Sequence, residues 1–352
     1  MSSRTPTVVT VVGARPQFIK AAPVSRALRD AGIREILVHT GQHFDDSMSG
    51  QFFRELGMEP PAHQLAINSL GHGAMTGRML EAVETILLQE KPDALLTYGD
   101  TNSTLAGALA AAKLHIPVAH VEAGLRSFNR AMPEEINRIL VDHMSALLFC
   151  PTETAIAHLA AENITHGVSH VGDVMMDATI DATKRAATQS TILADLALAP
   201  KTYAVCTLHR AENTDSPERF AALIAWLEAQ GAHTQIVMPV HPRTRKILAA
   251  LPTAPQHLRL IDPLGYLDMA WLVHHATAVF TDSGGLQKEA YFHRVPCVTL
   301  RDETEWVETI AAGWNRLWTV ADYQPRRDIA DYGNGDASAR IAQQLKAFLA
   351  AR

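Results

Sequence analysis

The sequence is poor in the residues that several classes of protein require. Only three cysteines occur among 352 residues, none in a Cys-x-x-Cys spacing, which argues against a zinc site, a redox pair or a disulfide scaffold. No apolar run reaches the roughly 18 residues of a membrane span. The short run at 7–12 is followed by Gly-Ala-Arg-Pro rather than a signal-cleavage site. We therefore expect a cytoplasmic protein with buried thiols and no membrane partner.

The chain also lacks an excess of basic residues. Its formal net charge is −6, from 31 Lys and Arg against 37 Asp and Glu. Nucleic-acid-binding domains normally carry a basic excess, so we expect no nucleic-acid partner. With 47% hydrophobic and 19% charged residues, the composition is that of an ordinary globular protein. Its length exceeds what one hydrophobic core usually supports, which predicts two domains.

β-branched apolar runs alternate with helical patterns along almost the whole chain, in two series. The first series predicts buried parallel strands at 7–12, 35–39, 94–97, 117–121 and 146–149. The second predicts strands at 203–207, 235–239, 258–261, 278–281 and 297–300. We expect an α/β fold with two Rossmann-like, doubly wound domains facing a cleft. The N-terminal domain is expected at 1–175, with the C-terminal helix 336–352 packing back on it, and the second domain at 176–335.

The stretch at 281–289, Thr-Asp-Ser-Gly-Gly-Leu-Gln-Lys-Glu, is the most informative. It joins an apolar strand to a helix, where unpaired N–H groups and the helix dipole form a seat for a phosphate. Glu289 would lie about one and a half turns into the helix, where it can accept hydrogen bonds from a ribose diol. The pattern indicates a nucleotide diphosphate, although an ordinary glycine-containing turn would look similar.

Three carboxylates occur at the ends of neighbouring elements of the first domain. Asp100 follows a strand, and either it or Thr101 is placed to cap the next helix. Glu122 ends an apolar strand, where a carboxylate is rarely present for packing. Glu134 begins a helix and could serve only the helix dipole. Together they predict a site that moves protons on and off weakly acidic positions.

Basic residues follow other strands in both halves. Arg15 and Lys20 follow the first strand without a Gly-x-Gly-x-x-Gly motif, so no dinucleotide cofactor is expected. They would place two cations near a diphosphate, unless they are simply surface residues. In the second half, His209 with Arg210, and His241 with Arg243, follow successive strands. A metal between the two histidines is the lesser alternative, since neither motif offers a further ligand.

Seven motifs appear in order between residues 8 and 310. They are GARPQFIK at 13–20, TGQH at 40–43, YGDT at 98–101, HVEAGLR at 120–126, PEEINR at 133–138, HRAEN at 209–213 and DSGGLQKE at 282–289. Together they resemble the non-hydrolysing UDP-N-acetylglucosamine 2-epimerases. The resemblance implies two domains of the glycosyltransferase-B type, a homodimer, and neither a metal nor a cofactor.

The resemblance also implies the reaction. The sugar loses its C2 proton while UDP leaves C1, and UDP then adds back to the resulting 2-acetamidoglucal as a proton reaches the opposite face. The product pair would be UDP-GlcNAc and UDP-ManNAc. The implied acid/base residues are Asp100, Glu122 and Glu134, with His209 stabilising the departing phosphate. The implied UDP-sugar-binding residues are Arg15, Lys20, Arg138, Arg210, His241, Arg243, Tyr266, Ser283, Gly284, Gly285, Glu289 and Arg301.

Three departures from the family pattern bear on substrate and regulation. Many members read RPE where this chain has RPQ at 15–17, and TERPE where it has TEWVE at 304–308. Both variants are closer to the branch acting on UDP-2,3-diacetamido-2,3-dideoxy-glucuronate, a sugar of bacterial surface polysaccharides such as O-antigens. The DRQ run of members activated by a second UDP-GlcNAc is absent near 70–73, although Gln42 and His43 stay as regulatory candidates.

Other functions remain open at this point. An inverting glycosyltransferase would share the fold and the phosphate seat, but it needs only one base and an acceptor groove. A nucleotide-sugar sensor could dispense with the acids, and a hydrolysing epimerase would release UDP. The three acids of the first domain favour the non-hydrolysing epimerase.

Overall fold

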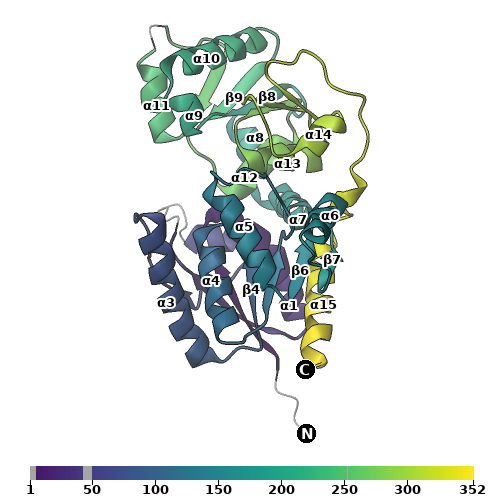
Figure 1. Cartoon of the computed structure of the whole chain (residues 1–352). Coiled ribbons are helices and arrows are strands. Elements are labelled where there is room, and N and C mark those ends of the chain that lie inside the picture. Colours follow the sequence, from purple (N-terminus) through teal and green to yellow (C-terminus); the bar gives the residue numbers. More distant parts are fainter. Residues whose placement is uncertain (1–4, 43–49, 252) are drawn as a thin grey trace. The chain divides into compact units, whose positions relative to one another are not determined.

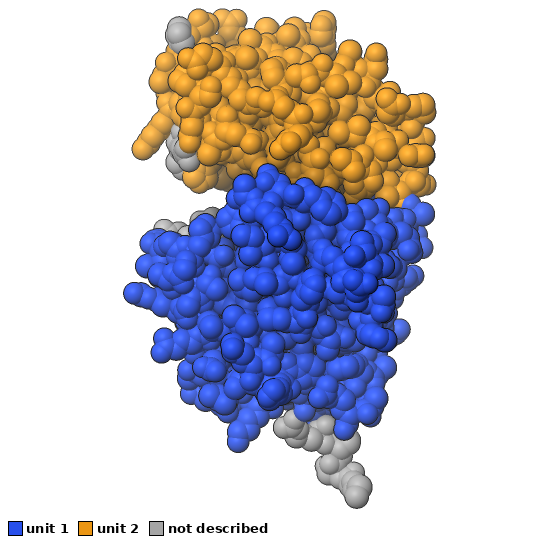
Figure 2. All heavy atoms as spheres, viewed as in Figure 1, with its two compact units in different colours: residues 1–178, 330–352 blue, residues 179–329 orange. Residues whose placement is uncertain are grey.

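The computed structural model describes residues 5–42, 50–251 and 253–352. The chain divides into two compact units (Figure 2). Unit 1 comprises residues 1–178 and 330–352, and unit 2 comprises residues 179–329. Each is built on a parallel β-sheet with helices packed against it (Figure 1).

The sheet of unit 1 has the strand order β3-β2-β1-β4-β5-β6-β7, with every pair parallel. Its strands are β1 (Thr7–Val12), β2 (Arg34–His39), β3 (His63–Gln64), β4 (Ala94–Tyr98), β5 (Val118–Val121), β6 (Leu147–Cys150) and β7 (Val168–His170). The five strands expected here are present, with ends shifted by at most one residue. The edge strands β3 and β7 were not predicted, because two or three residues are too few to show a period.

The helices of unit 1 surround this sheet. They are α1 (Arg15–Asp30), α2 (Gly50–Leu56), α3 (His72–Glu90), α4 (Asn102–Lys113), α5 (Pro133–Met144), α6 (Glu153–Ala161), the start of α7 (Val174–Gln189), the short η1 (Ala330–Tyr332) and α15 (Ala337–Ala350). Helices α3, α4 and α5 lie side by side, and the C-terminal α15 packs on α1 (Figure 1). Small residues of α4 allow close packing, since Gly107 lies directly over Val11 of β1.

The sheet of unit 2 has the order β10-β9-β8-β11-β12-β13, also parallel. Its strands are β8 (Tyr203–Thr207), β9 (Gln235–Pro239), β10 (Leu258–Ile261), β11 (Ala278–Thr281), β12 (Cys297–Thr299) and β13 (Asn315–Leu317). Its helices are α8 (Ile192–Asp195), α9 (Ala211–Thr214), α10 (Pro217–Gly231), α11 (Pro242–Ala249), α12 (Tyr266–His274), α13 (Gly284–Phe292) and α14 (Val307–Ala311). All five expected strands are present. The short edge strand β13 was missed for the same reason as β3 and β7.

In each sheet the strand order reverses once, between two neighbouring strands. In unit 1 the reversal lies between β1 and β4, and in unit 2 between β8 and β11. Ligands of doubly wound folds bind outside the carboxyl ends of the strands at this switch point. The loops after these four strands begin at Gly13, Gly99, Leu208 and Asp282. These loops carry four of the seven motifs, so the motif residues lie where ligands of such folds bind.

Two further findings concern the whole described chain. Among the described helices, none combines the length and the apolar character that crossing a membrane requires. Cys150, Cys206 and Cys297 are buried free thiols. Burial raises the pKa of each thiol above its ordinary value, so these side chains act as small apolar core residues.

Candidate active site

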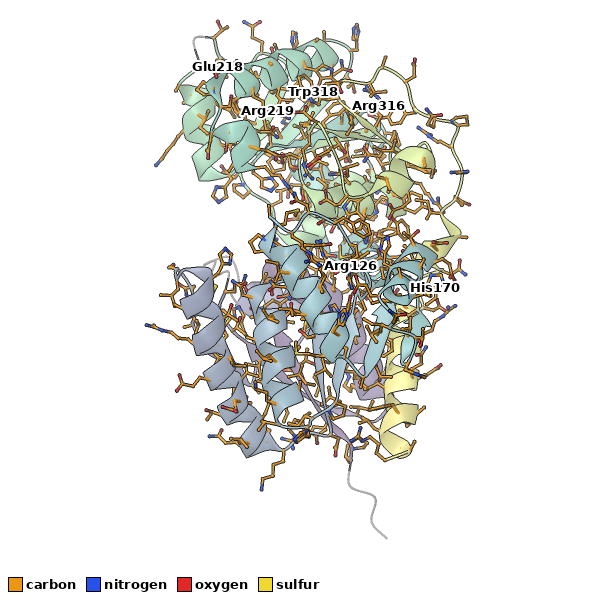
Figure 3. The ribbon with its side chains drawn as sticks, in the orientation of Figure 1. Arg126, His170, Glu218, Arg219, Arg316 and Trp318 are labelled. Carbon is orange, nitrogen blue, oxygen red and sulfur yellow. The ribbon has the colours of Figure 1, made fainter. Side chains whose placement is uncertain are left out.

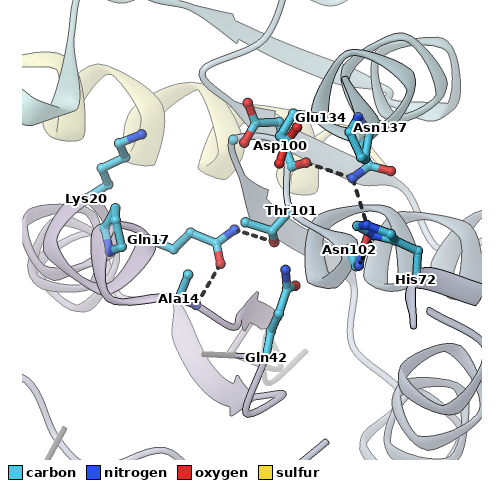
Figure 4. A pocket seen from close by; sticks show the side chains of 13 residues that line it. Ala14, Gln17, Lys20, Gln42, His72, Asp100, Thr101, Asn102, Glu134 and Asn137 are labelled. Atoms are coloured by element: carbon cyan, nitrogen blue, oxygen red, sulfur yellow. Dashed lines mark hydrogen bonds between the residues drawn. The ribbon is translucent and has the colours of Figure 1, made fainter. Parts of the chain in front are cut away.

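Unit 1 contains a cavity of about 240 Å³ at the carboxyl ends of β1 and β4 (Figure 4). The starts of α1, α4 and α5 form its walls. Its lining includes six polar side chains, those of Gln17, Lys20, Gln42, Asp100, Glu134 and Asn137. Two of the three predicted acids therefore face one cavity, although 34 residues separate them in the chain.

Asp100 is not the cap of α4. That position belongs to Thr101, whose hydroxyl accepts a hydrogen bond from the backbone N–H of Thr104 at 3.3 Å. The Asp100 carboxylate instead pairs with Arg138 at 2.5 Å, and its carbonyl accepts from the Asn137 amide at 2.8 Å. The structure thus removes capping as the explanation for this aspartate.

The environment of Asp100 suits proton transfer. Burial raises the pKa of its carboxyl above the ordinary value, and the nearby Glu122 charge adds to this rise. Arg138 and Lys20 oppose the rise without cancelling it. An aspartate with a raised pKa keeps its proton to a higher pH than usual, which favours a role in proton transfer.

Glu122 lies in the turn after β5 and forms an ion pair with Lys20. Its backbone has φ of +73°, a left-handed conformation that is strained for a residue other than glycine. Burial alone lowers the pKa of Lys20, but the Glu122 carboxylate raises it above the ordinary value. Lys20 was expected near a diphosphate. In this structure its ammonium forms an ion pair with Glu122. Lys20 therefore lies beside the three carboxylates Asp100, Glu122 and Glu134, which we call the acid cluster.

Glu134 is the second residue of α5 and is partly exposed in the cavity. Its neighbour Glu135 has a different role. The Glu135 side chain is buried and accepts hydrogen bonds from the backbone N–H groups of Ser127 and Phe128, each at 2.9 Å. It also pairs with Arg138 at 2.9 Å. Only the first of these two adjacent glutamates is therefore available to a ligand.

Gln17 is a site residue whose importance the sequence did not reveal. Its side-chain oxygen accepts from the N–H groups of Gly13 at 2.8 Å and Ala14 at 3.1 Å, and its amide donates to the Tyr98 carbonyl at 2.6 Å. It therefore ties the turn after β1 to the end of β4. An ionised glutamate could not donate to Tyr98, so the glutamine of the RPQ variant has a structural consequence.

Two other predicted residues of unit 1 have identifiable contacts. The Arg15 guanidinium lies over the Phe52 ring, 5.3 Å from its centroid. The side-chain amide oxygen of Gln42 accepts from the backbone N–H of Ser103 at 2.9 Å and from its hydroxyl at 2.7 Å. Gln42 therefore satisfies the start of α4. The other regulatory candidate, His43, lies outside the described residues.

In unit 2, the buried Asp282 organises the predicted phosphate seat. Its carboxylate accepts from the backbone N–H groups of His209 at 2.9 Å and Arg210 at 2.8 Å, and from the Asn213 amide at 3.1 Å. Burial opposes ionisation, but hydrogen bonds from His209 and these backbone groups lower the pKa of Asp282 below its ordinary value. The ionised Asp282 thus holds the loop after β8 against the start of α13, whose N-cap is Ser283.

His209 is half exposed, with its Nδ1 atom 3.2 Å from the Asp282 carboxylate. A histidine held through one nitrogen by a buried carboxylate presents its other nitrogen in a fixed direction. The position of His209 therefore favours contact with a ligand over a purely structural role.

A second polar cluster covers the start of α13. Arg301 pairs with Glu212 at 3.0 Å and with Glu305 at 2.7 Å. The Trp306 indole donates to the Gly284 carbonyl at 2.9 Å. A Cβ atom on Gly284 would lie 2.6 Å from the Glu305 carboxylate, so a side chain here would displace Glu305. Glu305 and Trp306 belong to the TEWVE variant, and their proximity to Gly284 could not be predicted from the sequence.

The remaining predicted residues of unit 2 occupy different surroundings. Glu289 is half buried in the second turn of α13, Gly285 is exposed, and Tyr266 is buried at the start of α12. His241 is exposed after β9, whereas the side chain of Arg243 lies outside the described residues. Among the side chains that are described, no three His, Cys, Asp or Glu residues gather as a metal-ligand set.

Comparison with known proteins agrees with these motifs. A family model described as UDP-N-acetylglucosamine 2-epimerase matches residues 26–346. The chain belongs to this family. A UDP-N-acetylglucosamine 2-epimerase homolog of Methanococcus maripaludis is 49% identical over 357 residues, covering 96% of this chain and 99% of that protein. The UDP-2,3-diacetamido-2,3-dideoxy-D-glucuronate 2-epimerase of Pseudomonas aeruginosa is 49% identical over 356 residues, with the same coverage.

Among solved structures, the UDP-GlcNAc 2-epimerase of Methanocaldococcus jannaschii, in complex with UDP-GlcNAc and UDP, superposes with a TM-score of 0.83. It is 39% identical and covers 97% of this chain and 99% of that one. The comparisons confirm the predicted family, the glycosyltransferase-B-like fold with two parallel sheets, and an enzyme of the UDP-sugar 2-epimerase type.

The raised pKa of Asp100 predicts a stability effect with a definite sign. Because the folded state binds this proton more tightly than the unfolded state, ionised Asp100 destabilises the fold above its raised pKa, and this cost disappears as the pH falls through that pKa. Asp100→Asn should therefore melt at or above the wild-type temperature near neutral pH. Its advantage should shrink on acidification, as measured by differential scanning fluorimetry.

The exposed Asp322 provides the control, since Asp322→Asn should leave the melting temperature nearly unchanged near neutral pH. A lower melting temperature for Asp100→Asn at every pH would mean that the Arg138 ion pair outweighs burial. The pKa of Asp100 would then not be raised.

Proposed function

We propose that this enzyme epimerises C2 of a UDP-linked 2-acetamido sugar by eliminating and re-adding UDP, with no second substrate. The observation that carries the proposal is the unit 1 cavity, in which Asp100 and Glu134 face the same space beside the Lys20–Glu122 ion pair. Family membership supplies the UDP-sugar class. A glycosyltransferase would have no use for a second proton-transferring carboxyl in this cavity.

In the proposed reaction, one carboxylate removes the C2 proton. The electrons of the C–H bond form the C1–C2 double bond as the bond from C1 to the phosphate oxygen breaks. In the reverse step, a UDP oxygen attacks C1 while a carboxylic acid delivers a proton to the other face of C2. We assign the two proton transfers to Asp100 and Glu134, because these two carboxylates line the cavity, whereas Glu122 lies beside it in an ion pair with Lys20.

The leaving group requires its own stabilisation, because negative charge grows on the β-phosphate as the C1 bond breaks. We propose that His209 donates to this phosphate through the nitrogen that Asp282 does not hold. The open N-terminus of α13 at Ser283 and Gly284 would receive the diphosphate, and Glu289 the ribose. The cations Arg15, Arg210, His241, Arg243 and Arg301 and the ring of Tyr266 are the further binding candidates.

We also propose that the sugar is UDP-2,3-diacetamido-2,3-dideoxy-glucuronate rather than UDP-GlcNAc. Two variants support this choice, the Gln17 amide that links β1 to β4 and the Trp306 indole that anchors Gly284. The Pseudomonas relative that acts on this sugar is as similar as any relative described above. Synthesis of a bacterial surface polysaccharide, such as an O-antigen, in the cytoplasm would follow from that substrate.

A homodimer is the proposed assembly. Its support is an apolar stripe on α5 and the residue before it, formed by Met132, Ile136 and Leu140 at intervals of four residues. These side chains are 38%, 46% and 44% exposed. Apolar side chains aligned along one helix face are typical of a surface that another protein covers.

The reaction predicts exchange at C2. Incubation of either UDP-GlcNAc or the diacetamido-glucuronate in D2O should replace the C2 proton with deuterium and produce both epimers, as read by NMR. We expect faster exchange with the diacetamido-glucuronate. Sugar transfer to an added acceptor without exchange would instead indicate a glycosyltransferase, and accumulating free UDP a hydrolysing epimerase.

The acid cluster predicts a loss of turnover on neutralisation. Asp100→Asn and Glu134→Gln should each lower kcat by about 10²- to 10⁴-fold, the usual effect of removing an acid/base group. Glu122→Gln should also lower kcat, because it leaves the buried Lys20 ammonium beside Asp100 without its partner. UDP affinity should be kept, because UDP is assigned to unit 2. The exposed Glu81→Gln on α3 is the matched control. Three folded variants with near wild-type rates would contradict the proton chemistry.

Glu289 and His209 should separate binding from catalysis. Glu289→Ala should weaken UDP binding by about 1.5–3 kcal/mol, or roughly ten- to a hundredfold, because it removes a charge-assisted partner of the ribose. His209→Asn should lower kcat more than UDP affinity, because its partner gains charge only in the transition state. Calorimetric titration and steady-state rates measure the two effects. Equal affinity losses without an extra loss of rate would remove the leaving-group role of His209.

A further inference from the structure

His120 of β5 is fully buried, and both of its ring nitrogens have close oxygen partners. Its Nδ1 atom lies 2.7 Å from the Asp142 carboxylate, and its Nε2 atom lies 2.7 Å from the backbone carbonyl of Gly99. These two partners come from the last turn of α5 and from the turn after β4. The ring therefore connects two elements that each carry residues of the acid cluster.

Both oxygens can only accept hydrogen bonds. A carbonyl has no proton, and Asp142 is ionised, because its second oxygen accepts from the Arg126 guanidinium at 2.7 Å and from the Gly124 N–H at 3.1 Å. A neutral imidazole has one N–H, so its other nitrogen would point a lone pair at an oxygen 2.7 Å away. Such a contact in a buried site leaves an acceptor unsatisfied and is costly. Only the doubly protonated ring satisfies both contacts.

The charges around the ring are compatible with a cation. Asp142 also accepts from Arg126 at 2.7 Å, and Arg126, labelled in Figure 3, forms two hydrogen bonds with Glu162. Asp142, Glu162 and Arg126 leave one negative charge, which an imidazolium at position 120 balances. The other titratable group beside Glu162 is the exposed His143, 3.7 Å away. On the Gly99 side, the facing charged groups are Asp100, Glu122 and Lys20, of which the last two neutralise each other.

We propose that His120 is held as an imidazolium by its two acceptors and is a positioning residue that sets the spacing of the Asp100 and Glu122 carboxylates. The Gly99 carbonyl that it holds immediately precedes Asp100, and the ring itself lies two residues before Glu122. Asp142 extends the link, because its second oxygen accepts from the backbone N–H of Gly124 at 3.1 Å. One rigid chain of hydrogen bonds thus fixes both turns.

Backbone strain at these turns explains why they need holding. Gly99, Glu122 and Gly124 have φ values of +62°, +73° and +78°. The value at Glu122 is costly because this residue has a side chain, and such a conformation persists only when its surroundings impose it. The His120–Asp142 pair supplies fixed partners on either side of Glu122. The effect of this positioning on turnover rests on the proposed epimerase function, whereas the protonation state of the ring does not.

The protonation state can be measured directly. In protein labelled with ¹⁵N-histidine, long-range ¹H–¹⁵N NMR from about pH 6 to about pH 9 spans the ordinary histidine titration. The His120 signal, identified by its loss in His120→Phe or its change in Asp142→Asn, should show two protonated nitrogens throughout. A neutral ring near pH 8 would overturn the imidazolium.

Two variants test the positioning role. Asp142→Asn can present its amide to Nδ1, which makes the ring neutral but keeps the N–H donated to Gly99. This variant should retain kcat within about threefold. His120→Phe keeps a planar ring but leaves the Gly99 carbonyl without its donor. It should lower kcat and C2 deuterium exchange at least tenfold while the dissociation constant of UDP stays unchanged.

The outcomes are distinguishable from a failure of the proposed function. A folded His120→Phe with wild-type kcat, or a loss of kcat that is equal in the two variants, would overturn the positioning role. If His120→Phe does not fold, Asp142→Asn decides alone, since a neutral ring with kcat reduced more than tenfold contradicts the proposal. Absence of C2 exchange in the wild-type protein would refute the epimerase function and leave the NMR result standing.

Discussion

The Lys20–Glu122 ion pair is the interaction on which the unit 1 site depends. Both groups are largely buried, with side-chain exposures of 15% and 7%. Removing one partner of such a pair leaves an uncompensated charge in a poorly solvated place. The pair cancels its own charge beside Asp100, and on the other side Arg138 forms ion pairs with both Asp100 and Glu135. Lys20 and Arg138 therefore balance two of the three negative charges of Asp100, Glu122 and Glu135, so that uptake of one proton brings this group to neutrality.

In both units a buried aspartate accepts from one or more backbone N–H groups of a loop at the carboxyl edge of the sheet. A parallel sheet ends at its carboxyl edge in loops whose backbone N–H groups lack strand partners, and buried N–H groups must be satisfied. Asp282 satisfies those of His209 and Arg210 in unit 2, and Asp142 satisfies that of Gly124 in unit 1. Each aspartate also contacts a histidine of its loop or strand. The carboxylates that shape these loops are distinct from those that face a ligand.

The strand pattern and the motifs were predictable from the sequence because they are local. The ten predicted strands were recognisable as short apolar runs between helical patterns, and Glu122 was recognisable as an acid at the end of such a run. The contributions of Gln17 and Asp142 were not predictable, because both depend on partners far along the chain. Asp142 contacts His120 across 22 residues from within a helix, where an aspartate ordinarily faces solvent. Glu305 reaches Gly284 only because β11 and β12 are neighbours.

The costly features of unit 1 lie at the ends of two neighbouring strands, β4 and β5. Asp100 has a raised pKa, Glu122 combines burial with a left-handed backbone, and His120 is surrounded by groups that demand a charge. Each of these opposes folding unless its neighbours compensate for it, and none is needed to build a doubly wound sheet. A chain retains such features where they are required for function. Asp100 and Glu122 lie on the turns after β4 and β5, and His120 lies within β5, so the features that oppose folding gather at the carboxyl ends of these two neighbouring strands.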